Sequence, residues 1–426
     1  MRNKAKLFLI ILFLFLCPAA VMAAEVLTWQ DCIIEAAKNH PDLIAAQEQV
    51  KQSEASKKIT ASTLYPQVTS NLGASTARTQ KDNSAGSVAD SYSYGVSGTQ
   101  LIFDGIKTIN NVRAAKENIE ASKQNFKFTS VTVRLRLRTA FVNLLTAQDM
   151  LRITKEIYDI RRSNLELISL RYESGLEHKG ALLTAEADLA QAEYEISQAK
   201  RNMEVTERDL VKEMGRMQLT PIEVKGDFQV KDAAKVKPDF ESLAKDNPSL
   251  KQLVAQKNAA DFSLRSAYAN FSPTLNGAAG ANKNGTRWEP RGNQWNLGLT
   301  LSMPIFEGGL RFAQVSQAKA LLHQLQENER STRDGIVLTL EQTWAALQDA
   351  VENVRVQEKQ LIATQERSKI AQAQYSIGFI SFDNWTIIED NLVSAKQNFL
   401  NAQANALLAE ANWIQAKGET IEYAQN

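Results

Sequence analysis

The chain has 426 residues, of which 44% are hydrophobic and 23% are charged, and its formal net charge at pH 7 is +1. This near-neutral balance argues against a nucleic-acid-binding protein, which would carry a basic excess on one face. Only 9 prolines and 7% aromatic residues are few for several compact domains. Long stretches rich in Ala, Gln, Glu, Lys and Leu are instead typical of long helices and coiled coils.

The first residues have the pattern of an export signal. Arg2, Lys4 and Lys6 precede an unbroken apolar run at 7–17, which is too short to cross a bilayer as a helix. Small residues follow, so 1–23 is predicted to be a cleaved signal peptide, with an uncleaved anchor as the alternative. Cys32 is then the only cysteine, and its apolar helical surroundings predict a packed small residue.

The rest of the chain contains two copies of one repeat unit. Asn39-His40-Pro41 recurs as Asp246-Asn247-Pro248 at a displacement of 207 residues, and later landmarks recur at 203. The later matches are Phe103-Asp104-Gly105 with Phe306-Glu307-Gly308, Tyr172 with Tyr375, Gly175 with Gly378, and Gly215 with Gly418. Because the displacement stays constant over many such matches, it indicates an internal repeat. The copies are expected at 24–215 and 240–418, with a linker at 216–239 and a tail at 419–426.

Each copy is predicted to contain the same elements in the same order. A helix comes first, at 29–64 and 240–271. Two strands follow, at 67–75 and 92–103 in the first copy and at 274–282 and 294–306 in the second. A very long helix comes next, at 106–173 and 310–376, and a shorter helix closes each copy, at 181–214 and 383–417. At 1.5 Å per residue each long helix would extend about 100 Å, too far for the core of an ordinary globular domain.

Two further patterns concern the long helices and the linker. The long helices carry apolar residues at alternating spacings of four and three, as in a coiled-coil seam. These residues are Leu137, Phe141, Leu144, Leu151 and Tyr158 in the first copy, and Leu340, Trp344, Leu347, Val351, Val354 and Leu361 in the second. Periodicity leaves open whether the seam packs within one chain or between chains. In the linker, Ile222-Glu223-Val224 alternates like a short strand.

The strand at 294–306 alternates between apolar and small polar residues. Its apolar residues are Trp295, Leu297, Leu299, Leu301 and Met303. The chain offers little else as a core for them, so we expect this face to meet lipid and the other face to line water. Four strands cannot close a barrel, so several chains must share one. The alternative is a periplasmic coiled-coil scaffold or adaptor without a membrane barrel, in which Trp295 to Met303 would pack on protein.

These features together resemble the TolC-like outer membrane efflux proteins over essentially the whole mature chain. The resemblance rests on the opening Leu27-Thr28-Trp29, the aromatic-Asp/Glu-Gly turns at Phe103-Asp104-Gly105 and Phe306-Glu307-Gly308, and the helix-tip turns that end at Gly175 and Gly378. It implies a mainly α fold with a small β part. It also implies a homotrimer whose shared twelve-stranded outer-membrane β-barrel continues into a periplasmic α-helical coiled-coil tunnel, with the linker in an equatorial domain.

The resemblance also implies a function and partners. The chain would be the exit duct of a tripartite efflux pump or type I secretion system, in the outer membrane of a Gram-negative bacterium. A periplasmic adaptor (membrane fusion) protein would dock on the helix tips at Tyr172, Gly175, Tyr375 and Gly378. The adaptor would join the duct to an inner-membrane transporter of the RND, ABC or MFS type. Glycines that only turn the chain are the alternative for the tips.

A periplasmic constriction is a further expectation from the resemblance. The family's usual acidic position matches Asn384, and Asp383 is the nearest carboxylate. Three copies of Asp383 around an axis would bind a passing cation. The alternative is that Asp383 only stabilises the start of a helix.

No catalytic constellation is present in the sequence. His40, His178 and His323 are isolated from one another, and no phosphate loop or nucleophile elbow occurs. Carboxylate pairs such as Glu186 and Asp188 are typical of a solvated helix. The sequence therefore predicts a protein that is not an enzyme and has no cofactor, no metal site and no nucleic-acid partner.

Overall fold

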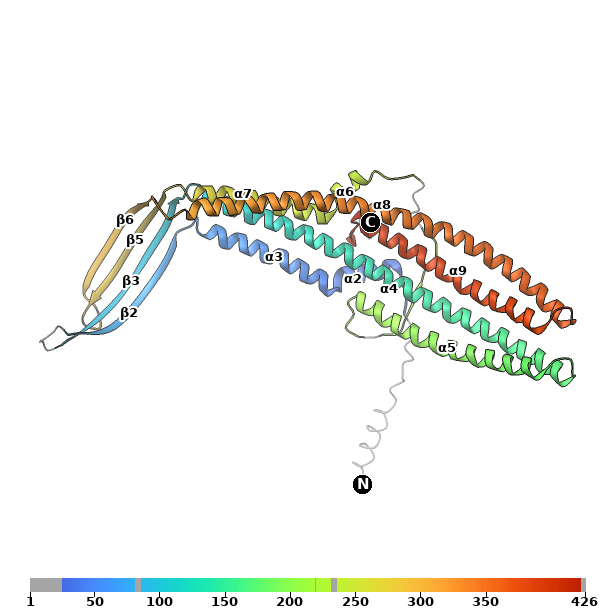
Figure 1. Ribbon diagram of the computed structural model, residues 1–426. Coiled ribbons are helices and arrows are strands. Elements are labelled where there is room, and N and C mark those ends of the chain that lie inside the picture. The colour runs from blue at the N-terminus through green and yellow to red at the C-terminus, as the bar shows by residue number, and fades with distance from the viewer. Residues whose placement is uncertain (1–24, 81–85, 219, 231–235, 423–426) are drawn as a thin grey trace, which may run out of the picture.

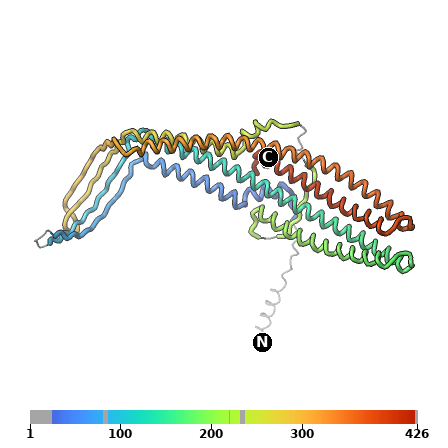
Figure 2. The backbone as a smooth tube through the Cα atoms, viewed as in Figure 1, coloured from blue at the N-terminus to red at the C-terminus, as the bar shows by residue number. Residues whose placement is uncertain are grey.

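The computed structural model describes residues 25–80, 86–218, 220–230 and 236–422, so the expected signal peptide at 1–23 lies outside the described residues. The chain forms an elongated rod with a four-stranded sheet at one end and two helical hairpins at the other (Figure 1). The last described residues, up to 422, lie part-way along the rod, beside the long helices (Figure 2). None of the helices in the described ranges is both long and apolar enough to cross a membrane.

Two helices of 67 residues each, α4 (Lys107–Glu173) and α8 (Leu310–Ser376), run from the sheet to the far end of the rod. At 1.5 Å per residue each is about 100 Å long. The helix α5 (Lys179–Glu213) packs along α4, and α9 (Phe382–Lys417) packs along α8. Each copy therefore ends in a helical hairpin, and the four observed helices begin and end within two residues of the expected bounds.

The helix that opens each copy is divided in two, so the expectation of one continuous helix at 29–64 and 240–271 was wrong. The first copy has α2 (Trp29–Asn39) and α3 (Pro41–Ser62), and the second has α6 (Phe240–Asp246) and α7 (Pro248–Ala269). Proline lacks an amide hydrogen and disfavours the helical conformation in the residue before it. The preceding residues, His40 and Asn247, are accordingly extended, with ψ of 123° and 128°.

The sheet contains four antiparallel strands in the order β2-β3-β5-β6. They are β2 (Gln67–Thr79), β3 (Ser87–Phe103), β5 (Thr274–Gly285) and β6 (Gly292–Ser302). The first two extend beyond the expected 67–75 and 92–103, because the residues of the longer loop continue the ladder as far as Thr79 opposite Ser87. The expected strand 294–306 ends earlier, at Ser302, so Met303 lies one residue beyond it.

A small second sheet lies part-way along the rod. The strand β1 (Glu25–Thr28) pairs in parallel with β4 (Ile222–Lys225), which is the short strand expected in the linker. Ile222 and Val224 join a core that contains Cys32, which is fully buried. Burial raises the pKa of the Cys32 thiol to about 12, as expected of a packed cysteine rather than a reactive one.

Part of the coiled-coil seam is buried within the single chain. Leu137, Phe141 and Leu144 of α4 lie in the core around Cys32. Leu340 and Leu347 of α8 pack with Phe240 and Trp413. At these five positions the spacing of four and three residues therefore reflects packing of α4 and α8 against elements of the same chain. This is one of the two possibilities that the sequence left open.

Candidate functional site

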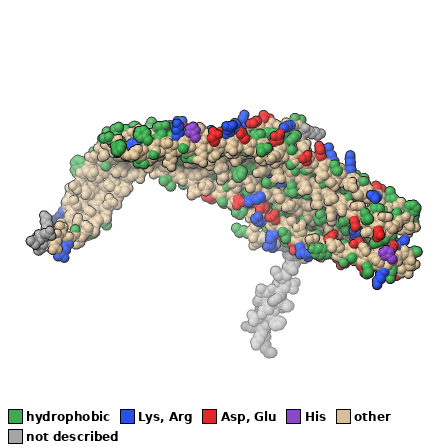
Figure 3. All heavy atoms as spheres, in the orientation of Figure 1, with side chains coloured by type: hydrophobic (Ala, Val, Ile, Leu, Met, Phe, Trp, Pro, Cys, Tyr) green, Lys and Arg blue, Asp and Glu red, His purple; other side chains and the backbone are tan. Residues whose placement is uncertain are grey.

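The four-stranded sheet has one apolar face and one polar face. Because directly paired residues project to the same side, the ladder that runs from Ser70 through Val96 and Ala281 to Trp295 defines one face. That face carries Val68, Leu72, Tyr92, Tyr94, Val96, Trp295, Leu297, Leu299 and Leu301. The opposite face carries Thr69, Asn71, Ser93, Ser97, Asn282, Gln294, Asn296 and Thr300. The side of the sheet in view in Figure 3 is almost entirely in the colour of polar uncharged side chains and backbone.

The apolar face is not covered by the chain itself. The five residues of the expected lipid-facing set, from Trp295 to Met303, are between 63% and 79% exposed. The scaffold alternative predicted that these side chains pack on protein. Within the described residues they do not.

Charged residues are confined to the two ends of the sheet. The segments 67–77, 91–103, 274–282 and 292–302 contain no Asp, Glu, Lys or Arg. Charges begin at Arg78, Asp90 and Lys283 toward the loops, and at Asp104 and Glu307 toward the helices. The sheet is therefore crossed by an uncharged band, and strands of 9 to 11 residues are long enough to cross a hydrocarbon layer when tilted.

The opposite end of the rod consists of two helix tips. Gly175 follows α4 with φ of 70°, and Gly378 follows α8 with φ of 78°. A Cβ atom on either glycine would meet nothing within 4 Å. Glycine is therefore favoured at both tips because it adopts the left-handed backbone conformation readily, and not because a side chain would lack space.

The two tip tyrosines have different surroundings. Tyr172 is 39% exposed, whereas Tyr375 is 1% exposed. The Tyr375 ring stacks on Trp385 with centroids 4.4 Å apart, and its hydroxyl donates to Oε2 of Glu177 over 2.8 Å. Burial and the contact with Glu177 raise the pKa of Tyr375, so the hydroxyl stays protonated at neutral pH. The first copy has Leu182 at the position of Trp385, and within the described part of the chain Tyr172 has no equivalent ring stack.

Tyr375 and Glu177 belong to different hairpins, and Arg171 strengthens the connection between them. The guanidinium of Arg171 lies 4.8 Å from the ring centroid of Tyr375 and donates to the backbone oxygens of Tyr375 and Ser376 over 3.3 Å each. Further from the tips, Arg161 of α4 binds Asp390 of α9. The sequence did not predict these contacts of Arg161, Arg171 and Glu177, because contacts between residues some 200 positions apart leave no local pattern.

The residues of the expected constriction lie at the start of α9. The backbone nitrogen of Asn384 donates to the hydroxyl of Ser381 over 3.4 Å, which caps the helix. Asp383 and Asn384 are both exposed, and within the described ranges Asp383 makes no ion pair. In the part of the chain that the structure describes, no three His, Cys, Asp or Glu side chains are placed to hold a metal ion.

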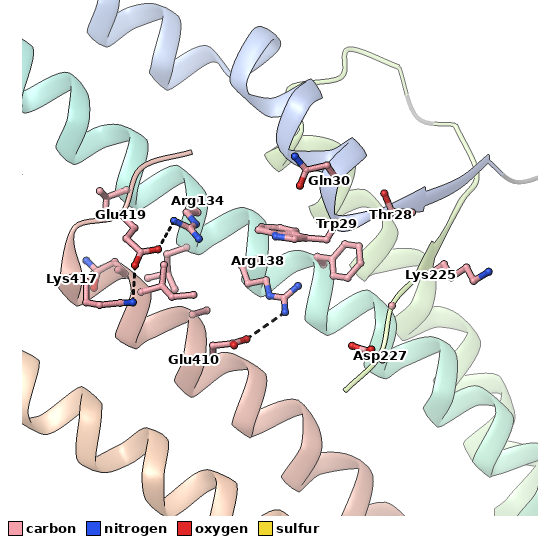
Figure 4. Close-up of a pocket in the computed structure, with 17 residues that line it drawn as sticks. Thr28, Trp29, Gln30, Arg134, Arg138, Lys225, Asp227, Glu410, Lys417 and Glu419 are labelled. Atoms are coloured by element: carbon pink, nitrogen blue, oxygen red, sulfur yellow. Dashed lines mark hydrogen bonds and ion pairs between the residues drawn. The ribbon is translucent and has the colours of Figure 1, made fainter. Parts of the chain in front are cut away.

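A cavity of about 650 Å³ lies part-way along the rod between α4, α9 and the start of α2 (Figure 4). The guanidinium of Arg138 lies 4.9 Å from the ring centroid of Trp29 and 3.7 Å from a carboxylate oxygen of Glu410. Burial lowers the pKa of Arg138. Nearby, Arg134 binds Glu419 over 3.1 Å. These contacts fasten the first helix and the C-terminal residues to α4, and we assign the cavity a structural role.

Comparison with known proteins identifies the family. The sequence profile described as outer membrane efflux protein matches residues 32–216 and 240–419, which correspond to the two copies and together make up more than half of the chain. The chain belongs to the outer membrane efflux protein family.

This efflux protein has distant relatives over most of its length. It is 22% identical to the outer membrane efflux protein BepC of Brucella suis over 368 residues, which cover 82% of this chain and 77% of BepC. It is 23% identical to the outer membrane protein TolC of Escherichia coli over 305 residues, 66% of this chain and 60% of TolC. Its fold matches the Campylobacter jejuni CmeC outer membrane channel with a TM-score of 0.81 and 19% identity, over 91% of this chain and 84% of that one.

The expectations on fold class, function and location are confirmed. The efflux protein is mainly α with a small β part and an internal repeat, and it is a TolC-like outer-membrane channel with a large periplasmic portion. It acts as the exit duct of an efflux or secretion system. The family is one of transport channels.

Proposed function

We propose that three copies of the chain form one continuous duct, with a shared twelve-stranded β-barrel in the outer membrane and a tunnel of long helices in the periplasm. The observation that carries this proposal is the uncharged, two-faced band of the sheet. Its exposed apolar residues suit contact with hydrocarbon, and its small polar residues suit a water-filled interior.

The unpaired edges of the sheet support a barrel shared between chains. The strands β2 and β6 lie at the two edges, where their outer backbone groups have no neighbouring strand among the described residues. Unpaired backbone groups in lipid each cost several kcal/mol. Pairing β6 of one chain with β2 of the next removes both edges, and three repetitions close the ring.

The helix tips are the proposed docking point for a periplasmic adaptor, which connects the duct to an inner-membrane transporter of the RND, ABC or MFS type. Exposed apolar side chains surround the two tip glycines: Leu176 beside Gly175, and Ile377 and Phe379 beside Gly378. Tyr172 is accessible to such a partner. Tyr375 is buried, and we assign it the role of positioning the tips.

The linker and the chain ends form the proposed equatorial domain around β1 and β4. The proposal includes no enzymatic activity, no cofactor and no nucleic-acid partner. The near-neutral charge and the isolated histidines of the sequence support this part. The proposed role of the protein is to conduct substrates across the outer membrane.

A pair of neighbouring substitutions tests the proposal. Leu299 lies on the apolar face opposite Gly277, and Thr300 lies on the polar face opposite Asn276. Leu299→Lys places a charge toward lipid, at a cost of up to roughly 2–4 kcal/mol per chain. We expect it to abolish heat-resistant trimers in outer-membrane fractions, while Thr300→Lys assembles and alters the ion selectivity of single channels. Equal assembly of the two variants, or recovery of the wild type as a soluble periplasmic monomer, would exclude a lipid-facing role for the apolar face.

A further inference from the structure

The loop end of the sheet carries an excess of positive charge. Four exposed basic residues lie there, which we call the basic rim: Arg78, Lys283, Arg287 and Arg291. The acidic residues of the same region, within the described ranges, are Asp90 and Glu289. Asp90 accepts a hydrogen bond from Thr76 over 2.8 Å. Among the described residues none of the four basic side chains makes an ion pair.

Two residues of the basic rim continue the apolar face of the sheet. Arg78 follows Leu72 on the same face of β2 at an even spacing, and Lys283 lies directly opposite Tyr94. Along this face Lys283 lies level with Tyr94 and Leu72, two residues beyond the level of Trp295. Arg78 lies six residues further along β2, opposite Val88. Figure 3 shows basic side chains at the loop end of the sheet.

A hollow of about 240 Å³ lies where the apolar face meets the basic rim. It is lined by Leu72, Tyr92, Tyr94, Trp288, Glu289 and Pro290, among others. The turn between β5 and β6 folds back over the sheet, because the Trp288 ring packs edge-on against Tyr92 with centroids 6.0 Å apart. Aromatic rings and the Glu289 side chain therefore border one small space, next to the level of Lys283 on the sheet.

We infer that the basic rim and this hollow bind the phosphorylated sugar headgroup of a lipid in the outer leaflet. The inference rests on the proposed function, because it requires the apolar face to lie in the membrane. A lipid whose acyl chains pack on Leu297 and Trp295 has its headgroup at the level of Tyr94 and Lys283. Basic side chains at that level attract anionic headgroups. The aromatic rings offer flat surfaces against which sugar rings pack, and Arg and Lys donate charge-assisted hydrogen bonds to phosphate.

The amphiphilic character of the surface favours a lipid over a soluble anion. A free phosphate or nucleotide would bind to the basic residues alone and would need no adjoining apolar band. Here the charged and apolar parts are continuous on one face, which matches a molecule with a charged head and hydrocarbon tails.

The double variant Arg78→Gln with Lys283→Gln tests the inference in the purified oligomer of the full chain. Its matched control is Lys200→Gln with Arg201→Gln, which removes two exposed basic residues from α5, far from the sheet. Native mass spectrometry would count molecules of diphosphorylated lipid A bound per oligomer. We expect about 30-fold weaker binding for the double variant, since each basic residue near an anionic lipid contributes roughly fivefold, and unchanged binding for the control.

A second variant and a second lipid complete the test. Trp288→Ala opens the hollow and should also weaken binding, while dephosphorylated lipid A should bind wild-type protein as weakly as the double variant binds the phosphorylated form. The inference would be overturned if the double variant and the wild type retained phosphorylated lipid equally. If those oligomers still conducted ions, the proposed channel function would stand. Failure of the wild type to form membrane oligomers would instead count against the proposed function.

Discussion

His40 and Asn247 occupy the same place in the two copies of the chain and make the same pair of contacts with different chemistry. Nδ1 of His40 accepts a hydrogen bond from the backbone nitrogen of Asp42 over 3.1 Å, and Oδ1 of Asn247 accepts one from that of Ser249 over 2.9 Å. Both residues therefore cap the helix that begins at the following proline.

The second contact of each residue reaches the last helix of its copy. Nε2 of His40 lies 3.4 Å from Oε2 of Glu213, and Nδ2 of Asn247 donates to the backbone oxygen of Ala416 over 3.2 Å. Glu213 and Ala416 are equivalent positions, separated by the displacement of 203 residues. Because Nδ1 of His40 is an acceptor, the imidazole hydrogen lies on Nε2 and faces the carboxylate.

The first prediction exchanges the two capping groups. His40→Asn should keep the cap on α3 and change stability little, whereas His40→Ala should destabilise the protein by about 1 kcal/mol, since an N-cap is lost. Glu213 retains Lys212 and Arg136 as partners in both variants, so no unpaired buried carboxylate adds to the cost. The measurement is the thermal unfolding temperature of the purified protein, with Asn247→Ala as the matching loss in the second copy. A His40→Asn variant as unstable as His40→Ala would show that the imidazole, not the cap, matters.

The second prediction concerns the connection between the hairpins. Tyr375→Phe keeps the stack on Trp385 but removes the hydrogen bond to Glu177, which at a charged, largely buried acceptor is worth about 1.5–3 kcal/mol. The two tips should then separate more readily, and the conductance of single channels should rise. Tyr172→Phe is the matched control, because no hydrogen bond from the Tyr172 hydroxyl occurs among the described residues. Equal conductance of Tyr375→Phe and wild type would show that the contact does not hold the tips together.

The sequence predicted the helices and the two-faced strand well, because each is recorded in a local pattern. Alternation over Trp295 to Met303 needs only neighbouring residues, and the absence of Gly and Pro from 106–173 permits a long helix. The break between α2 and α3 at His40 was not predicted, although Pro41 is a known helix breaker. The apolar pattern is helical on both sides of Pro41, and it therefore favoured one continuous helix. The unequal surroundings of Tyr172 and Tyr375 could not be predicted. They depend on Trp385 and on Glu177 of the other hairpin, which only the packing of the two hairpins brings to one tyrosine.

The third prediction separates docking from turn formation at the second tip. Gly378→Ala meets no steric obstacle and costs about 1–2 kcal/mol for its left-handed backbone. Gly378→Pro additionally removes the amide that donates to the Tyr375 oxygen over 2.9 Å, and proline cannot adopt a φ of 78°. We expect Gly378→Pro to abolish efflux, measured as drug susceptibility of cells, while heat-resistant trimers still form, and Gly378→Ala to be milder. Loss of the trimer in Gly378→Pro would mean that the turn is needed for assembly.

The fourth prediction concerns Asp383, which is exposed in the first turn of α9. If three Asp383 side chains face one axis, their combined charge attracts multivalent cations far more strongly than monovalent ones, because the Coulomb energy scales with cation charge. Asp383→Ala should then weaken the block of single-channel current by a trivalent cation, and Asp383→Glu should preserve it. Asn384→Ala serves as the neutral control and should leave the block unchanged. A carboxylate that only favours the positive end of a helix would affect stability by about 0.3–1 kcal/mol and leave the block as in wild type. Current recordings and thermal unfolding on the same three variants therefore distinguish the constriction from the cap.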